Sequence, residues 1–145
     1  MSNYKKYKVG YTAGVYDLFH VGHLNILKNA KTMCDYLIVA VSTDELVEEY
    51  KNKSPVIPFN ERASIVEAIR FVDKVVPQTS RDKLEAHNKY KFDAMFVGDD
   101  WKGDPMWEKL GKDLERRGST IVYFEYTQQV SSTFLKEVLN KIAEE

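Results

Sequence analysis

The sequence predicts an α/β fold, a three-layer sandwich with a central parallel sheet of about five strands. Short apolar runs rich in β-branched residues alternate along the chain with longer segments whose apolar residues recur at helical spacing. Such alternation implies right-handed crossovers, so the strands run parallel and helices cover both faces of the sheet. The chain has 145 residues and no internal repeat or linker-like stretch, and we expect one domain over residues 1–145.

The apolar runs give the strands, which we place at residues 9–13, 36–41, 74–77, 94–97 and 120–124. Helical spacing is clear in residues 21–34, where Leu24, Leu27 and Ala30 share one face with Cys34. A second helix is predicted over residues 60–71, with Pro58 just upstream as a start signal. Three more helices are predicted at residues 81–90, 106–117 and 132–143.

Composition and charge exclude several classes of protein. The 21 Lys and Arg residues balance 22 Asp and Glu residues, which disfavours a broad surface for nucleic acid or anionic membranes. The single cysteine, Cys34, cannot form an internal disulfide or a cysteine-based zinc site, and we expect it buried on its helix. We expect His87 to be exposed. The N-terminus lacks the apolar core of a signal peptide, and no apolar run approaches the roughly 20 residues of a membrane span, which predicts a cytoplasmic protein.

The segment after the first strand carries the strongest functional signal. Ligands of parallel sheets bind beyond the carboxyl ends of the strands. Here His20 and His23 are three residues apart, on one face of a helical turn, and Gly22 between them removes a side chain where a ligand must approach. Two imidazole donors at a helix N-terminus suit a phosphate. A pair of capping histidines and a metal site are the alternatives, the latter disfavoured because zinc-binding helix pairs are spaced i, i+4.

Two other strand ends carry candidate ligand groups. Ser131, Ser132 and Thr133 begin the last predicted helix, either as a second phosphate site or as an ordinary N-cap. Asp100 and Trp101, after the fourth strand, offer a carboxylate and an aromatic plane for a base. The alternatives there are a helix cap with a packing anchor, or a metal site made with the preceding aspartate.

Basic residues after the second strand offer a site for an anionic second substrate. Lys51 and Lys53 fall in residues 48–58, which we predict as a loop, and Arg62 follows in the next helix. Surface lysines are more often simply solvated, so on the residues alone neither interpretation is favoured.

These motifs together resemble the cytidylyltransferase branch of the nucleotidyltransferase superfamily, whose fold is Rossmann-like. Residues 14–17 with residues 20–23 match its GxFDxxHxGH signature, and Gly98-Asp99-Asp100-Trp101 is similar to the GDDW segment of the bacterial glycerol-3-phosphate cytidylyltransferases. Residues 126–133 are similar to the RTxGISTT motif, but Tyr126 replaces its arginine and Gln129 its glycine. The tail of that segment is also similar to the ISST element of adenylyltransferases.

The resemblance implies transfer of a cytidylyl group from CTP to an alcohol phosphate, sn-glycerol 3-phosphate first, by direct in-line displacement, with Mg²⁺ carried by the nucleotide. It assigns catalysis to His20, His23 and Lys53 and binding of the acceptor to Asp17, Lys51, Lys53 and Arg62. It assigns nucleotide binding to Gly14, Val15, Tyr16, Gly22, Gly98, Asp100, Trp101, Tyr126, Thr127, Ser131 and Ser132. It implies no metal ligands on the protein and a homodimer.

Two rival hypotheses stay open. The first is a nucleotidyltransferase that uses ATP, or that acts on another polyol, aminoalcohol or sugar phosphate, and Gln129 with the segment after it motivates this alternative. The second is a regulatory nucleotide-binding module without turnover, motivated by the loss of the arginine at Tyr126.

Overall fold

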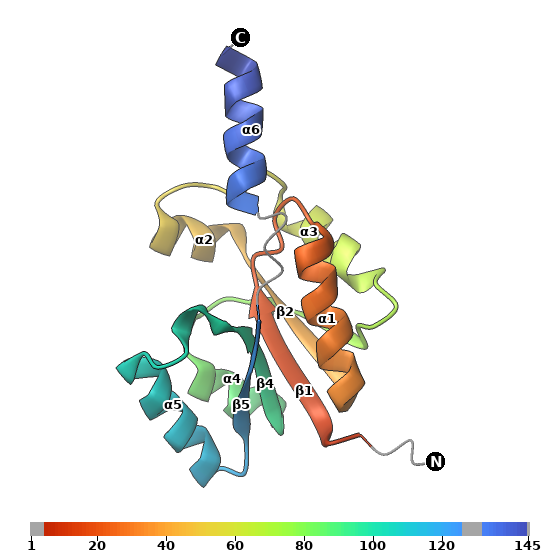
Figure 1. The fold of residues 1–145 in the computed structure, drawn as a ribbon, viewed down its shortest axis with the longest axis vertical. Helices are drawn as coiled ribbons and strands as arrows, with labels where there is room; N and C mark the ends of the chain where they lie inside the picture. The colour runs from red at the N-terminus through yellow and green to blue at the C-terminus, as the bar shows by residue number, and fades with distance from the viewer. Residues whose placement is uncertain (1–4, 126–131, 145) are drawn as a thin grey trace.

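A five-stranded sheet forms the centre of the molecule in the computed structural model, which describes residues 5–125 and 132–144 (Figure 1). Every neighbouring pair of strands is parallel, and their order is β3-β2-β1-β4-β5. The strands are β1 (Tyr7–Gly14), β2 (Cys34–Ser42), β3 (Lys74–Gln78), β4 (Ala94–Gly98) and β5 (Thr120–Phe124). The predicted α/β fold with a Rossmann-like parallel sheet is confirmed.

Three of the helices begin next to a short polar side chain that caps them, namely Thr43, Asp82 or Asp104. Asp104 precedes α5, accepts from the main-chain N–H of Met106 at 2.9 Å, and is followed by Pro105 in the first turn. Asp82 caps α4 in the same way. The helices are α1 (Val21–Met33), α2 (Asp44–Lys51), α3 (Phe59–Glu67), α4 (Lys83–Tyr90), the 3₁₀ turn η1 (Asp99–Trp101), α5 (Pro105–Arg116) and α6 (Ser132–Glu144).

Helix α2 was not predicted, because residues 48–58 read as a loop. The Thr43 side chain accepts from the N–H of Leu46 at 3.2 Å, and acidic residues follow in the first turn. These are ordinary start signals for a helix. The two prolines further on, Pro55 and Pro58, fit a loop only after the helix has ended at Lys51.

Two cores lie on opposite faces of the sheet. Along β2, Leu37, Val39 and Val41 face the core beneath α1 and α3, while Ile38 and Ala40 face the core beneath α4 and α5. A strand with both faces buried reads as a continuous apolar run, which is why β2 could be predicted. The sheet therefore has helices on both sides, and its carboxyl edge stays open for a site.

Three local predictions are wrong. Cys34 is buried, as expected, but it opens β2 instead of ending α1, and burial raises the pKa of its thiol. His87 is buried, because its ring packs edge-on against Phe92 with centroids 4.9 Å apart. Helix α3 ends at Glu67, four residues short of the predicted boundary.

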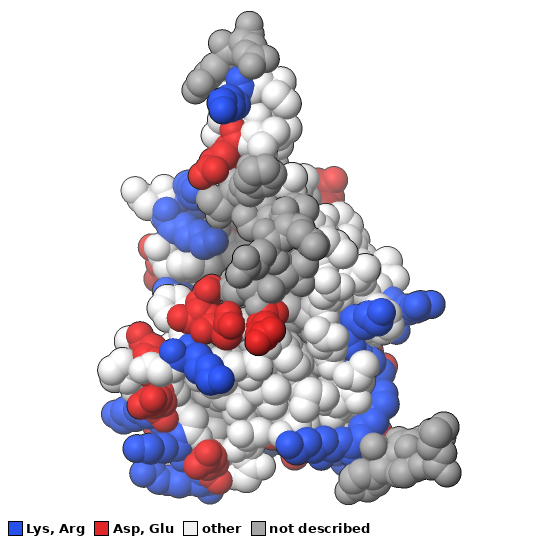
Figure 2. Space-filling view, in the orientation of Figure 1, with Lys and Arg blue, Asp and Glu red and all other residues white. Residues whose placement is uncertain are grey.

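Helix α6 stands away from the sheet at the top of Figure 1. No helix within residues 5–125 and 132–144 combines the length and apolar character needed to cross a bilayer. On the face drawn in Figure 2, Lys and Arg side chains lie among Asp and Glu side chains and form no single basic field. This mixture agrees with the near-zero net charge of −1.

Candidate active site

A cavity of about 830 Å³ opens at the carboxyl ends of the strands. It lies where the strand order reverses between β1 and β4. These two strands pair only at Gly10 with Ala94 and Tyr11 with Met95, so they part toward their carboxyl ends. The Thr12 hydroxyl, which lines the cavity, donates to the carbonyl of Phe96 at 2.8 Å. The gap between the strands forms the floor of the site.

The structure brings most of the predicted site residues to this cavity. Its lining includes Gly14, Val15, Tyr16, Asp17, His23, Lys51, Gly98, Asp100 and Trp101. Four predicted residues do not line it, namely His20, Gly22, Lys53 and Arg62. Tyr126, Thr127 and Ser131 lie outside the described residues, and Ser132 is the first residue of α6, with its side chain outside the described part.

The loop between β1 and α1 has an unusual backbone. Tyr16 and Leu18 adopt left-handed conformations, with φ of 55° and 51°. The buried Tyr16 ring folds back over Gly14, where an added Cβ would lie 3.1 Å from the ring. Left-handed conformations of non-glycine residues cost energy and cluster at functional sites. Here they turn the main chain into the cavity directly before the histidine pair.

His20 and His23 cap the start of α1. The N–H of Gly22 donates to Nδ1 of His20 at 3.0 Å, and the N–H of His20 donates to Nδ1 of His23 at 3.2 Å. The two rings stack with centroids 4.0 Å apart. The capping alternative from the sequence is thus observed, and it is compatible with a phosphate site.

The caps determine which ring nitrogen can donate to a ligand. An Nδ1 that accepts a main-chain hydrogen bond cannot carry the proton of a neutral imidazole, so each proton is on Nε2. Burial and the neighbouring His20 lower the pKa of His23 to about 4, and burial lowers the pKa of His20. Both rings are therefore neutral at pH 7, with an Nε2–H group on each available as a donor. His23 lines the cavity, and the His20 ring stacks on the His23 ring without itself lining the cavity.

Asp17 connects the β1–α1 loop to the segment before α3 and to α6. Its carboxylate accepts from the N–H groups of Val56 at 2.7 Å and Ile57 at 2.9 Å, and it pairs with Lys136 at 3.0 Å. Burial acts to raise the pKa of Asp17, but these three donors outweigh it and lower the pKa. Asp17 therefore holds together the loops around the cavity.

Arg62 does not lie where direct contact with an acceptor requires it. Its buried guanidinium donates to the carbonyls of Ile57 and Val15 at 2.7 Å and of Ser42 at 2.8 Å, and it pairs with Asp44 at 2.6 Å. Main-chain carbonyls and one carboxylate take these donors, so Arg62 is a positioning residue. It ties the ends of β1 and β2 to the starts of α2 and α3.

Of the two predicted lysines, the structure brings one to the cavity. Lys51 lines it from the end of α2, whereas Lys53 is exposed and does not line it. Burial lowers the pKa of Lys51, and the positive charges of Lys136, Lys53 and Arg81 lower it further. Lys53, which the resemblance assigns to both catalysis and acceptor binding, is thus absent from the cavity lining.

Four basic residues of the cavity were missed from the sequence, namely Arg81, Lys83, Lys109 and Lys136. Arg81 and Lys83 directly follow β3, so the rule that ligand groups follow strand ends could have found them. Lys136 lies within α6, and no sequence pattern distinguishes it from a solvated helix lysine.

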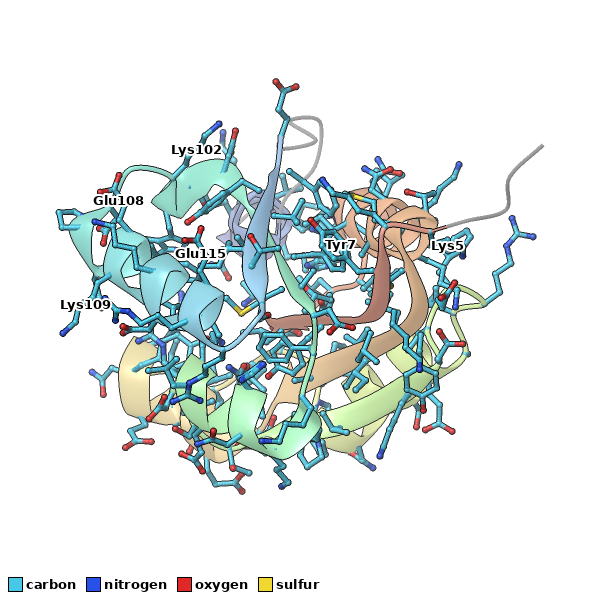
Figure 3. The ribbon with its side chains drawn as sticks, turned by 90° about the horizontal axis from the view of Figure 1, so that it is seen from below. Lys5, Tyr7, Lys102, Glu108, Lys109 and Glu115 are labelled. Atoms are coloured by element: carbon cyan, nitrogen blue, oxygen red, sulfur yellow. The ribbon has the colours of Figure 1, made fainter. Side chains whose placement is uncertain are left out.

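The segment after β4 forms the opposite wall. Trp101 ends η1 and stacks on Trp107 of α5, with centroids 6.1 Å apart and ring planes 9° apart. With 47% of its surface exposed, Trp101 offers an open aromatic face as well as a packing contact. Lys102 and Glu108 lie on the outside of the same segment (Figure 3). Among the described residues, no three His, Cys, Asp or Glu side chains gather as a metal site.

Comparison with protein families gives one match that spans most of the chain. Residues 11–138 match the family described as cytidylyltransferase-like. The glycerol-3-phosphate cytidylyltransferase of Staphylococcus aureus is 35% identical over 129 residues, which cover 88% of this chain and 92% of that protein. The enzyme of the same name from Bacillus subtilis is 35% identical over 127 residues, covering 87% and 92%.

Comparison with solved structures supports the fold. A lipopolysaccharide core biosynthesis protein from Thermoplasma volcanium superposes with a TM-score of 0.70 at 24% identity, covering 86% of this chain and 99% of that one. Pantoate-beta-alanine ligase from Francisella tularensis superposes with a TM-score of 0.63 at 16% identity, covering 98% and 72%. At these identities the likeness concerns the architecture alone.

Proposed function

Because the chain belongs to the cytidylyltransferase-like family of nucleotidyltransferases, we propose that it transfers a cytidylyl group from CTP to an alcohol phosphate. The first acceptor we propose is sn-glycerol 3-phosphate, which gives CDP-glycerol and pyrophosphate. Two relatives that carry this activity in their names, at 35% identity, support that choice. The observation that carries the proposal is the pair of neutral imidazoles at the start of α1, with the proton of each on Nε2.

The proposed reaction is a single displacement. A phosphate oxygen of the acceptor forms a bond to the α-phosphorus of CTP, and the bond from that phosphorus to the oxygen bridging to the β-phosphate breaks. The electron pair leaves with pyrophosphate, and no group of the protein becomes covalently bound. Catalysis is then positioning together with stabilisation of charge.

Each part of the cavity has a proposed task in that displacement. In this proposal, the Nε2–H groups of His20 and His23 donate to the α- and β-phosphates. The main-chain N–H groups of Val15 and Tyr16, two residues that line the cavity, are further donors. Lys51 neutralises charge on the reacting phosphates. We assign the base and ribose to Gly98, Asp100 and Trp101, and further phosphate contacts to Tyr126, Thr127, Ser131 and Ser132.

Magnesium belongs to the substrate in this proposal. Mg²⁺ enters as the complex with CTP, whose triphosphate oxygens supply most of its ligands.

A second candidate keeps the chemistry and uses ATP. It is favoured by Gln129 and by the similarity of residues 130–133 to an adenylyltransferase element. The third hypothesis, a regulatory module without turnover, is disfavoured because the histidine pair and Gly22 are intact.

Mass spectrometry of the products distinguishes these candidates. The protein is incubated with glycerol 3-phosphate and Mg²⁺, with CTP and ATP in parallel reactions. We expect CDP-glycerol and pyrophosphate from CTP and no corresponding product from ATP. Product from ATP alone would show that ATP, and not CTP, is the substrate. No product from either nucleotide would reject glycerol 3-phosphate as the acceptor, and no product with a panel of other alcohol phosphates would then favour the regulatory module.

We also propose a homodimer, on the basis of the family resemblance. Light scattering coupled to gel filtration should give twice the chain mass of 16.8 kDa. A mass equal to that of one chain at micromolar concentration would reject the dimer.

A further inference from the structure

Resting on the proposed cytidylyl transfer, we propose that the cavity selects an acceptor phosphate whose far end carries a second negative group, held by Arg81 and Lys83. Glycerol 3-phosphate ends in a neutral hydroxymethyl group. An acceptor that ends in a carboxylate or a second phosphate fits this cavity better and is preferred over glycerol 3-phosphate.

The strand order sets the order of ligand groups along the cavity. The residues proposed for the base follow β4, and the histidine pair follows β1. Arg81 and Lys83 follow β3, on the other side of β1, and two strand spacings separate β1 from β3 by roughly 10 Å. An acceptor with its phosphate at the histidine pair therefore extends its carbon chain toward Arg81 and Lys83.

Cations outnumber carboxylates on the β2–β3 side of the cavity. The cations that line it there are Lys51, Arg81, Lys83 and Lys136. Two carboxylates line the same side, and both are engaged. Asp17 pairs with Lys136 at 3.0 Å. Asp82 caps α4 through the N–H groups of Leu84 and Glu85, at 3.0 and 3.1 Å.

The remaining three cations lack a carboxylate partner in the part of the chain that the structure describes. Within the described residues, Lys51, Arg81 and Lys83 form no ion pair. The other charged residues of the lining come from the β4–α5 side, namely Asp100, Lys109 and Asp113. The proposed transfer assigns Lys51 to the reacting phosphates and gives Arg81 and Lys83 no task, so these two cations can take a second anion of the acceptor.

The surroundings of Arg81 and Lys83 favour the binding of an anion. The Arg81 guanidinium lies 4.4 Å from the centroid of the Tyr50 ring, which fixes its plane. Lys83 is half-buried, and burial together with the charge of Arg81 lowers its pKa to about 8. An anion bound between them restores the opposite charge that this site lacks, and a hydroxyl group does not.

Three acceptors with the same three carbons and one common phosphate test the preference. They are glycerol 3-phosphate, glycerate 3-phosphate and glycerol 1,3-bisphosphate, which differ only at the far carbon. With CTP and Mg²⁺, we expect kcat/KM at least about tenfold higher for one of the two charged acceptors. The charged acceptor with the higher kcat/KM shows whether the site prefers a carboxylate or a phosphate at the far end. Equal or better turnover of glycerol 3-phosphate would overturn the proposal.

Variants test whether Arg81 and Lys83 cause the preference for charged acceptors. In the double variant Arg81→Gln, Lys83→Met, we expect the ratio of kcat/KM between charged and neutral acceptors to fall about tenfold. Lys89→Gln, which removes an exposed cation at the other end of α4, serves as the matched control and should keep the ratio. A ratio unchanged in the double variant would assign the selectivity elsewhere and contradict the proposal.

A titration without nucleotide keeps the two proposals distinguishable. By calorimetry, the parent protein should bind the preferred charged acceptor about tenfold more tightly than glycerol 3-phosphate, and the double variant should not. If no acceptor receives a cytidylyl group, the proposed function fails. This titration then shows by itself whether Arg81 and Lys83 bind the second negative group of an acceptor. If transfer occurs but binding shows no preference, only the further inference fails.

Discussion

In the proposed reaction, the histidine pair has two tasks that use different atoms of each ring. Nδ1 of His20 holds the start of α1, and Nε2 is left for the ligand. An asparagine places its amide oxygen close to the position of Nδ1, and a glutamine reaches the position of Nε2. Substitution can therefore separate the cap from the donor.

For His20→Asn we expect kcat to fall by about 10²–10³, because the donor to phosphate is lost. The free energy of unfolding should change by less than about 1 kcal/mol, because the cap is retained. For His20→Gln we expect the reverse balance, with a smaller loss of kcat and a loss of about 1 kcal/mol of stability. Steady-state kinetics and urea unfolding measure the two effects. Full activity in His20→Asn would remove His20 from the catalytic role.

Arg62 is the residue on which the geometry of the loops depends. Arg62→Met would leave the carbonyls of Val15, Ser42 and Ile57 and the carboxylate of Asp44 without their buried donor. We expect the free energy of unfolding to fall by about 3–5 kcal/mol. Urea denaturation measures the loss.

Arg70→Met provides the comparison for that measurement. Arg70 is exposed, with its guanidinium 5.1 Å from the centroid of the Phe71 ring, and its substitution should cost less than about 0.5 kcal/mol. Equal losses in the two variants would argue against a special role for Arg62.

At the scale of the elements, the start of α1 makes stability depend on pH. The pKa of His23 is about 4 in the folded protein, below the 6.5 of an ordinary histidine. Between these values the unfolded chain binds a proton that the folded chain does not, so stability falls as the pH is lowered from 6.5 toward 4. We expect a loss on the order of 1–3 kcal/mol over this range, measured by urea unfolding. His23→Asn should reduce this slope, and an unchanged slope would contradict the assignment.

The elements differ in how well the sequence predicted them. Strands such as β2 are buried on both faces, and that environment selects a continuous apolar run that is easily read. Helix α2 has two buried residues, Leu46 and Val47, among mostly charged neighbours, so its periodicity is weak. Thr43 gives a start signal, but the helix that follows has only eight residues.

Within the candidate site, the sequence could indicate the residues that belong to a local motif. His20 and His23 act through contacts within three residues, so their spacing alone indicates the site. The environment of Arg62 was not predictable, because its partners lie up to 47 positions away in the chain. The cations Arg81 and Lys136 meet Lys51 only when three separate elements fold together.

At the scale of the whole molecule, positive charge is concentrated locally at the cavity although the chain has no excess of basic residues. The chain has a net charge of −1, yet its cavity gathers four cations on one side. A small phosphate-bearing ligand fits this distribution better than an extended polyanion. The fold therefore supports a site for nucleotide and acceptor phosphates without a generally basic surface.

Pyrophosphate exchange tests direct cytidylyl transfer most simply. The protein is incubated with CTP, Mg²⁺ and radiolabelled pyrophosphate, with and without glycerol 3-phosphate, and ATP replaces CTP in a parallel pair. A single displacement predicts that label enters CTP only when acceptor is present, because the reverse reaction needs the CDP-alcohol formed from it. Label entering CTP without acceptor would indicate a covalent cytidylyl-enzyme, and label entering only ATP would contradict the use of CTP.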